Sequence, residues 1–197
     1  MRRITWAMAF SVISSVFAGG ASATYHTFKF NELYSNPSGT VQFMELKESI
    51  GFNFQNFVTQ APDIKSTLHD FVFPADLPST ATANKTFILG TAGYAAIAGV
   101  PAPDYIIPAN FFNPAGDTIQ FGSTGPNGVV DVTTFGALPS EATQSLNRVG
   151  TTGNNFVVAT NSPTNFAGAA GSVPEPTSGL LLAGTGLRLL LRRRRGN

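Results

Sequence analysis

Short apolar runs separated by turn residues fill the central part of the chain, and this pattern limits the folds that the chain can adopt. Runs rich in Phe, Val, Ile and Thr recur between clusters of Gly, Pro, Asn and Ser, and no long segment has helical periodicity. The pattern predicts an all-β domain. We expect strands at residues 27–34, 41–47, 70–73, 86–90, 118–121, 129–134 and 155–159.

The segments between these runs have the composition of tight turns. SNPSG joins the first two strands, and GSTGPNG joins Phe121 to Val129. Residues 91–99 can form a short helical segment, and the prolines after it keep residues 100–108 extended. Short strands in this number predict a β-sandwich or a small barrel. We expect its core to include Phe28, Phe30, Phe43, Phe71, Phe87, Phe121 and Phe156.

Charge and cysteine content restrict the function of residues 24–173. Five Lys and Arg residues against ten Asp and Glu residues give this region a net charge of −5. Nucleic acid is therefore not an expected partner, because binding to phosphates requires a basic surface. The chain has no cysteine, so its stability in an oxidising compartment must come from the core rather than from disulfides.

The N-terminus has the pattern of a signal peptide, residues 1–23. Arg2 and Arg3 precede the apolar run ITWAMAFSVISSVFAGG, and the small residues Ala21 and Ala23 fit the cleavage site of signal peptidase. We expect export and a mature chain that begins at Thr24. An uncleaved N-terminal anchor is the alternative.

The C-terminus combines a short apolar segment, residues 178–191, with a basic end. These 14 residues are fewer than the roughly twenty that usually cross a bilayer as a helix, so the segment is a marginal transmembrane helix. Arg188 lies inside it, and its long side chain can reach the interface. A cytoplasmic location is favoured for the four arginines that follow, with a basic tail that binds nucleic acid or anionic lipid as the alternative. These arginines are Arg192, Arg193, Arg194 and Arg195.

Val173, Pro174, Glu175 and Pro176, followed at once by the apolar segment and the arginines, resemble the PEP-CTERM sorting signal. The resemblance implies export in a Gram-negative bacterium, recognition by a membrane-embedded exosortase and cleavage near the motif. Residues 174–197 would then be a transient inner-membrane anchor. Residues 169–173 are expected to be a linker.

The body resembles a second family, the lamin-tail-type domain, from Phe28 to about Gly168. The stretch FNELYSNPSGTVQFMELKE is similar to the start of that domain, FVFPADLPSTATANKTFILGTAGYAAI to its middle and SLNRVGTTGNNFVVATNSPTNFAG to its end. The resemblance implies that residues 24–168 form an immunoglobulin-like antiparallel β-sandwich.

Glu32 and Glu45 are the most suggestive pair of polar residues. The strands joined by SNPSG should be adjacent and antiparallel, which brings the two carboxylates within reach of each other. Such a pair can hold a hard cation such as calcium or act as an acid and a base. It can also accept backbone hydrogen bonds or pair with Arg148 or Lys47, and we favour this structural role.

No other motif indicates an enzyme or a cofactor. His26 and His69 are the only histidines, neither has a second ligand at metal-binding spacing, and no G-x-S-x-G elbow is present. We expect a non-enzymatic protein of the cell surface or extracellular matrix, associated with exopolysaccharide or the envelope, whose partners are signal peptidase, exosortase and the membrane. The alternative is a secreted carbohydrate-binding or hydrolytic protein that uses Glu32 and Glu45, alone or with calcium.

Overall fold

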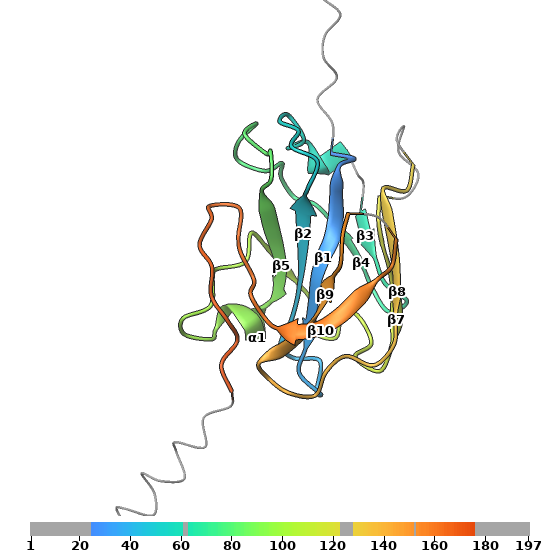
Figure 1. Ribbon diagram of the computed structural model, residues 1–197, viewed down its shortest axis with the longest axis vertical. Coiled ribbons are helices and arrows are strands. Elements are labelled where there is room, and N and C mark those ends of the chain that lie inside the picture. The colour runs from blue at the N-terminus through green and yellow to red at the C-terminus, as the bar shows by residue number, and fades with distance from the viewer. Residues whose placement is uncertain (1–24, 61–62, 123–127, 152, 176–197) are drawn as a thin grey trace, which may run out of the picture.

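Two β-sheets packed face to face form the body of the protein (Figure 1). The computed structural model describes residues 25–60, 63–122, 128–151 and 153–175. Its elements are β1 (Phe28–Ser35), β2 (Gln42–Glu48), η1 (Val58–Gln60), β3 (Asp63–Lys65), β4 (Asp70–Val72), β5 (Thr86–Thr91), α1 (Ala92–Ala95), β6 (Tyr105–Ile107), β7 (Asp117–Phe121), β8 (Asp131–Phe135), β9 (Gln144–Arg148) and β10 (Phe156–Thr160).

The structure confirms the all-β prediction, and the seven expected strands lie within two residues of their predicted ends. The larger sheet has the order β10-β9-β1-β2-β5-β6, and the smaller has the order β4-β3-β7-β8. β3, β6 and β9 were not predicted. In the part of the chain that the structure describes, neither of the short helices has the length and hydrophobicity of a membrane span. The expected signal peptide, with Ala21 and Ala23, and the segment from Pro176 through Arg192, Arg193, Arg194 and Arg195 lie outside the described residues.

One strand pair departs from the expected antiparallel arrangement, because β5 and β6 run parallel. A parallel neighbour requires a crossover instead of a hairpin. Here the crossover contains α1, which begins after Thr91, whose hydroxyl accepts a hydrogen bond from the Tyr94 N–H at 3.2 Å. Pro101 and Pro103 then favour an extended backbone up to β6.

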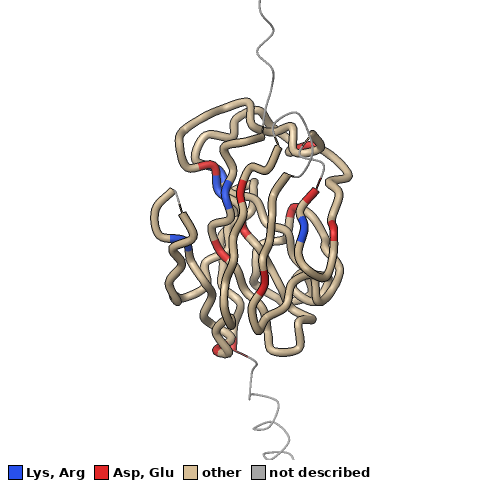
Figure 2. The backbone as a smooth tube through the Cα atoms, turned by 90° about the vertical axis from the view of Figure 1, so that its right-hand side faces the viewer, with Lys and Arg blue, Asp and Glu red and all other residues tan. Residues whose placement is uncertain are grey.

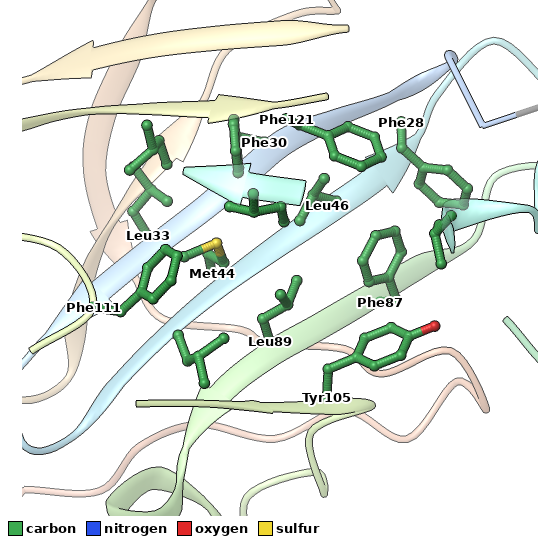
Figure 3. Close-up of a cluster of buried hydrophobic side chains, with 14 of the residues drawn as sticks. Phe28, Phe30, Leu33, Met44, Leu46, Phe87, Leu89, Tyr105, Phe111 and Phe121 are labelled. Carbon is green, nitrogen blue, oxygen red and sulfur yellow. The ribbon is translucent and has the colours of Figure 1, made fainter. Parts of the chain in front are cut away.

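The main core lies between the two sheets (Figure 3). Phe28 and Phe87 are fully buried there and meet edge to face, with ring centroids 4.9 Å apart. This is the geometry that aromatic pairs prefer. Of the other phenylalanines expected in the core, Phe30 and Phe121 are fully buried, and Phe71 and Phe156 pack half-buried against the cluster.

Phe43 belongs to a second, smaller cluster on the outer face of the larger sheet. Its members come from β1, β2, β5, α1 and the C-terminal end of the body: Tyr34, Phe43, Ile88, Tyr94 and Val173. The rings of Tyr34 and Phe43 stack with centroids 5.4 Å apart. The larger sheet is therefore covered on both faces in this region, which explains why β2 is buried along almost its whole length.

The cover on the outer face is a hairpin of residues 161–173, which we call the C-terminal strap. It runs upward from the end of β10 and returns beside β5, as the orange to red trace in Figure 1 shows. Asn165 N–H donates to the Ala169 carbonyl at 3.0 Å, and Gly171 N–H donates to the Pro163 carbonyl at 3.2 Å. Residues 169–173, expected to be a linker, thus form the returning arm of the strap.

Candidate functional site

The structure places Glu32 on β1 directly opposite Glu45 on β2. The register passes from Phe30 opposite Leu46 to Glu32 opposite Glu45, so Asn31 is an extra residue in β1, a β-bulge. Because side chains alternate between the faces of a strand, the extra residue turns Glu32 to the outer face of the sheet. The bulge therefore brings the two carboxylates together on one face.

Both carboxylates hold the C-terminal strap. The Ser162 N–H donates to Glu32 Oε1 at 2.9 Å, and the Thr164 N–H donates to Glu45 Oε2 at 2.6 Å. Glu32 Oε1 also accepts a hydrogen bond from the Ser145 hydroxyl at 2.6 Å. Backbone hydrogen bonds to these carboxylates thus hold the strap on the outer face of the sheet.

Asp104, just before β6, continues this arrangement. The Phe166 N–H donates to its Oδ2 at 3.1 Å, and the Ile88 N–H donates to the same oxygen at 2.8 Å. Burial raises the pKa of Asp104, and these two hydrogen bonds oppose the rise. In the arm of the strap that follows β10, residues 162, 164 and 166 therefore each donate their N–H to a carboxylate.

Burial also raises the pKa of Glu45 from its ordinary 4.5 to about 7. The negative charge of Glu32 adds to the rise, while the hydrogen bond from Thr164, that from Asn31 at 2.6 Å and the charge of Lys47 oppose it. The pKa of Glu32 is raised for the same main reason, burial. Near neutral pH, Glu45 is therefore only partly ionised, although its oxygens are occupied by hydrogen-bond donors.

This site is better suited to holding a backbone segment by hydrogen bonds than to binding or converting a ligand. Glu32 is 1% exposed and Glu45 is 2% exposed. No group of three or more His, Cys, Asp or Glu residues among those described could hold a metal ion. Neither histidine is a partner of the pair, since His26 is exposed and His69 stacks on the ring of Phe111 with centroids 6.1 Å apart.

Arg148, one of the partners considered for these carboxylates, instead pairs with Asp131 of β8. Its Nη2 lies 2.6 Å from Asp131 Oδ2, and the two side chains are 3% and 9% exposed. The same Asp131 oxygen accepts the Phe30 N–H at 2.9 Å, while Arg148 Nε donates to the Phe30 carbonyl. The ion pair therefore takes the place of a strand beside this part of β1.

The residues of the expected sorting motif lie at the boundary of the fold. Val173 is 3% exposed, and its N–H donates to Asn161 Oδ1 at 2.6 Å. Pro174 and Glu175 follow it and are exposed, and Pro176 lies outside the described residues. The first residue of the motif is thus part of the folded body.

Two contributors to this site were missed at the level of sequence, Asp104 and the strap. Asp104 is the only charged residue between 86 and 116, and a lone charge in an apolar stretch is a signal that its partners lie elsewhere in the fold. The strap sequence, NSPTNFAGAAGSV, has no alternating pattern that would predict pairing. No family model, curated protein or solved structure matches the chain.

Proposed function

We propose that the protein is an exported, non-enzymatic module of the cell surface or extracellular matrix of a Gram-negative bacterium, sorted by an exosortase. The observation that carries this proposal is the position of the motif. Val173 is held in the second cluster, whereas Pro174 and Glu175 leave the body exposed. Proline disfavours helix on its N-terminal side, so the motif is suited to an extended, accessible peptide beside a membrane.

The targeting segments complete the proposal. Signal peptidase cleaves after Ala23, and residues 178–191 then act as a transient anchor in the inner membrane. The arginines from Arg192 to Arg195 resist translocation and hold the end of the chain in the cytoplasm. Exosortase cuts near Pro174-Glu175-Pro176 and releases the body to the envelope or to the exopolysaccharide.

We also infer that the sandwich is of the immunoglobulin-like, lamin-tail type. The sequences that carry this resemblance at its two ends form β1 and β2 in one case, and β9 and β10 in the other. These four strands are neighbours in the larger sheet, in the order β10-β9-β1-β2. Their adjacency supports the resemblance in this half of the fold.

The surroundings of Glu32 and Glu45 favour the non-enzymatic surface protein over a hydrolase or carbohydrate-binding protein that uses these two carboxylates. A catalytic pair must reach its substrate, yet the strap covers both carboxylates and donates hydrogen bonds to them. Two surface cavities of about 230 Å³ are lined by other residues. We therefore assign the pair a structural role.

Replacement of Glu175 tests the sorting proposal. In a host that contains an exosortase, Glu175→Ala should leave full-length protein in the membrane fraction, because Glu175 is the only charge that the motif presents there. Replacing Arg192 to Arg195 together should release uncut precursor. Glu141→Ala is the matched control, since Glu141 is an exposed glutamate of the body. Processing of Glu175→Ala at the parental rate would reduce the motif to a proline-rich linker.

A further inference from the structure

A cavity of about 230 Å³ lies where β1 and β9 separate. These strands pair only at Glu32 with Asn147 and at Leu33 with Leu146. Toward the start of β1, the two strands no longer pair, and the Asp131–Arg148 ion pair hydrogen-bonds the β1 backbone instead. This arrangement leaves room beside β1. The side chains that line the cavity include Lys29, Asn31, Lys47, Ser49 and Arg148.

The cavity concentrates positive charge in an otherwise acidic body. Lys29, Lys47 and Arg148 are three of the five cations in residues 24–173, and no acidic residue lines the cavity. Figure 2 shows that the basic positions are few and that most of them lie on one side of the molecule. Even with Arg148 neutralised by Asp131, Lys29 and Lys47 give the cavity a positive charge that favours an anion.

The three cations are held in different ways. Arg148 is fixed by Asp131, and Lys29 donates to the Val130 carbonyl and lies 4.0 Å from Asp131. The ammonium of Lys47 forms no hydrogen bond or ion pair with the residues that the structure describes. Lys47 sits opposite Lys29 in the β1–β2 register, so their side chains share one face. The cavity therefore has a fixed wall and one ammonium available to a ligand.

The loop that follows Ser49 exposes large apolar side chains at the same end of the sandwich. Ile50, Phe52 and Phe54 are 54%, 54% and 60% exposed. The loop backbone is nevertheless anchored, since the Ile50 N–H donates to Glu48 Oε1 at 3.2 Å and the Phe54 N–H donates to the Thr80 carbonyl at 2.8 Å. Exposed apolar side chains on an anchored loop are typical of a contact surface.

Phe54 adds a sign of strain in this loop. Its φ is 63°, in the left-handed region that bulky residues rarely adopt. Strained residues of this kind persist only where the surrounding fold holds them, and they cluster at active and binding sites. The strained backbone of Phe54 and the exposed rings of Phe52 and Phe54 thus occur in the same loop.

We propose that this cavity binds the carboxylate or sulfate group of an acidic saccharide, with Phe52 and Phe54 contacting sugar rings along the same chain. Lys47 supplies a charge-assisted hydrogen bond to the anion, and Asn31 and Ser49 supply neutral ones. Lys29 stays with the Val130 carbonyl and adds its positive charge. The inference rests on the proposed function, since a saccharide is the ligand that a matrix protein meets. It deepens that function by naming a ligand class and the residues that bind it.

The net charge of the body selects among anionic ligands. At −5, the body repels a dense polyanion such as nucleic acid or an anionic bilayer surface. A saccharide with isolated acidic groups separated by neutral sugars avoids most of this repulsion. In Figure 1 the loop after β2 lies at the end of the sandwich opposite to the end of the red trace, so it is far from the expected sorting motif.

Calorimetric titration of the mature protein tests the proposal. The probe is a hyaluronan hexasaccharide, in which glucuronate alternates with N-acetylglucosamine, and the neutral control is the N-acetylglucosamine hexasaccharide. The mature protein should bind the acidic probe and not the neutral one. Lys47→Gln should weaken binding by about tenfold or more, because a hydrogen bond to a charged group is worth at least that factor. Phe52→Ala should weaken binding of the hexasaccharide but not of free glucuronate.

Lys65→Gln is the matched control, because Lys65 lies on β3 of the other sheet, between Asp63 and Asp70. It should bind the acidic probe like the parent. Absence of binding, or equal binding by Lys47→Gln, overturns the proposal. Equal affinity for sulfate and the hexasaccharide also overturns it, because the cavity would then be a site for small anions. Binding to phosphatidylglycerol vesicles but not to the hexasaccharide overturns it as well. None of these results bears on processing of Glu175→Ala, so the two proposals fail separately.

Discussion

Replacing Glu45 by Gln should change how the stability of the fold depends on pH. Burial raises the pKa of Glu45 from 4.5 to about 7 in the folded protein. Between these values the folded chain binds more protons than the unfolded chain, so the free energy of unfolding falls as the pH rises. At about 1.4 kcal/mol per pKa unit, Glu45 lowers the free energy of unfolding by about 3 kcal/mol between pH 4.5 and 8.

The amide of Glu45→Gln does not titrate, so this contribution disappears. Gln keeps an oxygen for the Thr164 N–H, and Asn31 can turn its amide to meet the new NH₂ group. The free energy of unfolding of the parent minus that of the variant should therefore decrease by about 3 kcal/mol between pH 4.5 and pH 8. Urea titrations followed by circular dichroism measure both values.

Glu141→Gln is the control for this prediction, because Glu141 is exposed. Its unfolding free energy should follow that of the parent at every pH. A constant difference between the parent and Glu45→Gln across this range would refute the reasoning. It would mean that Glu45 titrates in the folded protein as it does in the unfolded chain, so that the strap is held by an ordinary carboxylate.

Two further substitutions test the packing of the sandwich by urea denaturation. Phe28→Ala should lower the free energy of unfolding by about 3–5 kcal/mol, because it removes a fully buried ring. Phe52→Ala, which removes an exposed ring, should change the free energy of unfolding little. Equal effects of the two substitutions would contradict the core described. Arg148→Met should lower the free energy of unfolding by about 3–5 kcal/mol, because it removes the buried cation that donates a hydrogen bond to Asp131. Lys65→Met, at the surface, should leave stability nearly unchanged, and a similar loss in both would contradict the role of the buried pair.

Strands with strong local signals could be predicted from the sequence. In β5, apolar and β-branched residues fill both faces, and in β2 Phe43, Met44 and Leu46 mark the strand, because both faces of the larger sheet are covered there. The missed strands β3, β6 and β9 lack this signal. β3 and β6 have three residues each, and β9 is the largely polar QSLNR. Their positions depend on neighbours distant in sequence.

The pairing of Glu32 with Glu45 was accessible to sequence reasoning, but its purpose was not. The spacing of apolar residues changes from two to three between Phe30 and Leu33, which is the signature of the bulge at Asn31. The partners of the carboxylates are backbone N–H groups of the strap, about which side-chain patterns carry no information. The strap could therefore be placed only by the folded structure.

Mass spectrometry of the mature protein from its own host tests the central claim most directly. The account predicts a chain that begins at Thr24 and ends near Pro174-Glu175-Pro176, so that the strap, with Val173 in its cluster, stays with the body. Cleavage before Asn161 would remove the donors to Glu32 and Glu45 and contradict the role of the strap. A mature chain that still extends to Asn197 would contradict sorting by an exosortase.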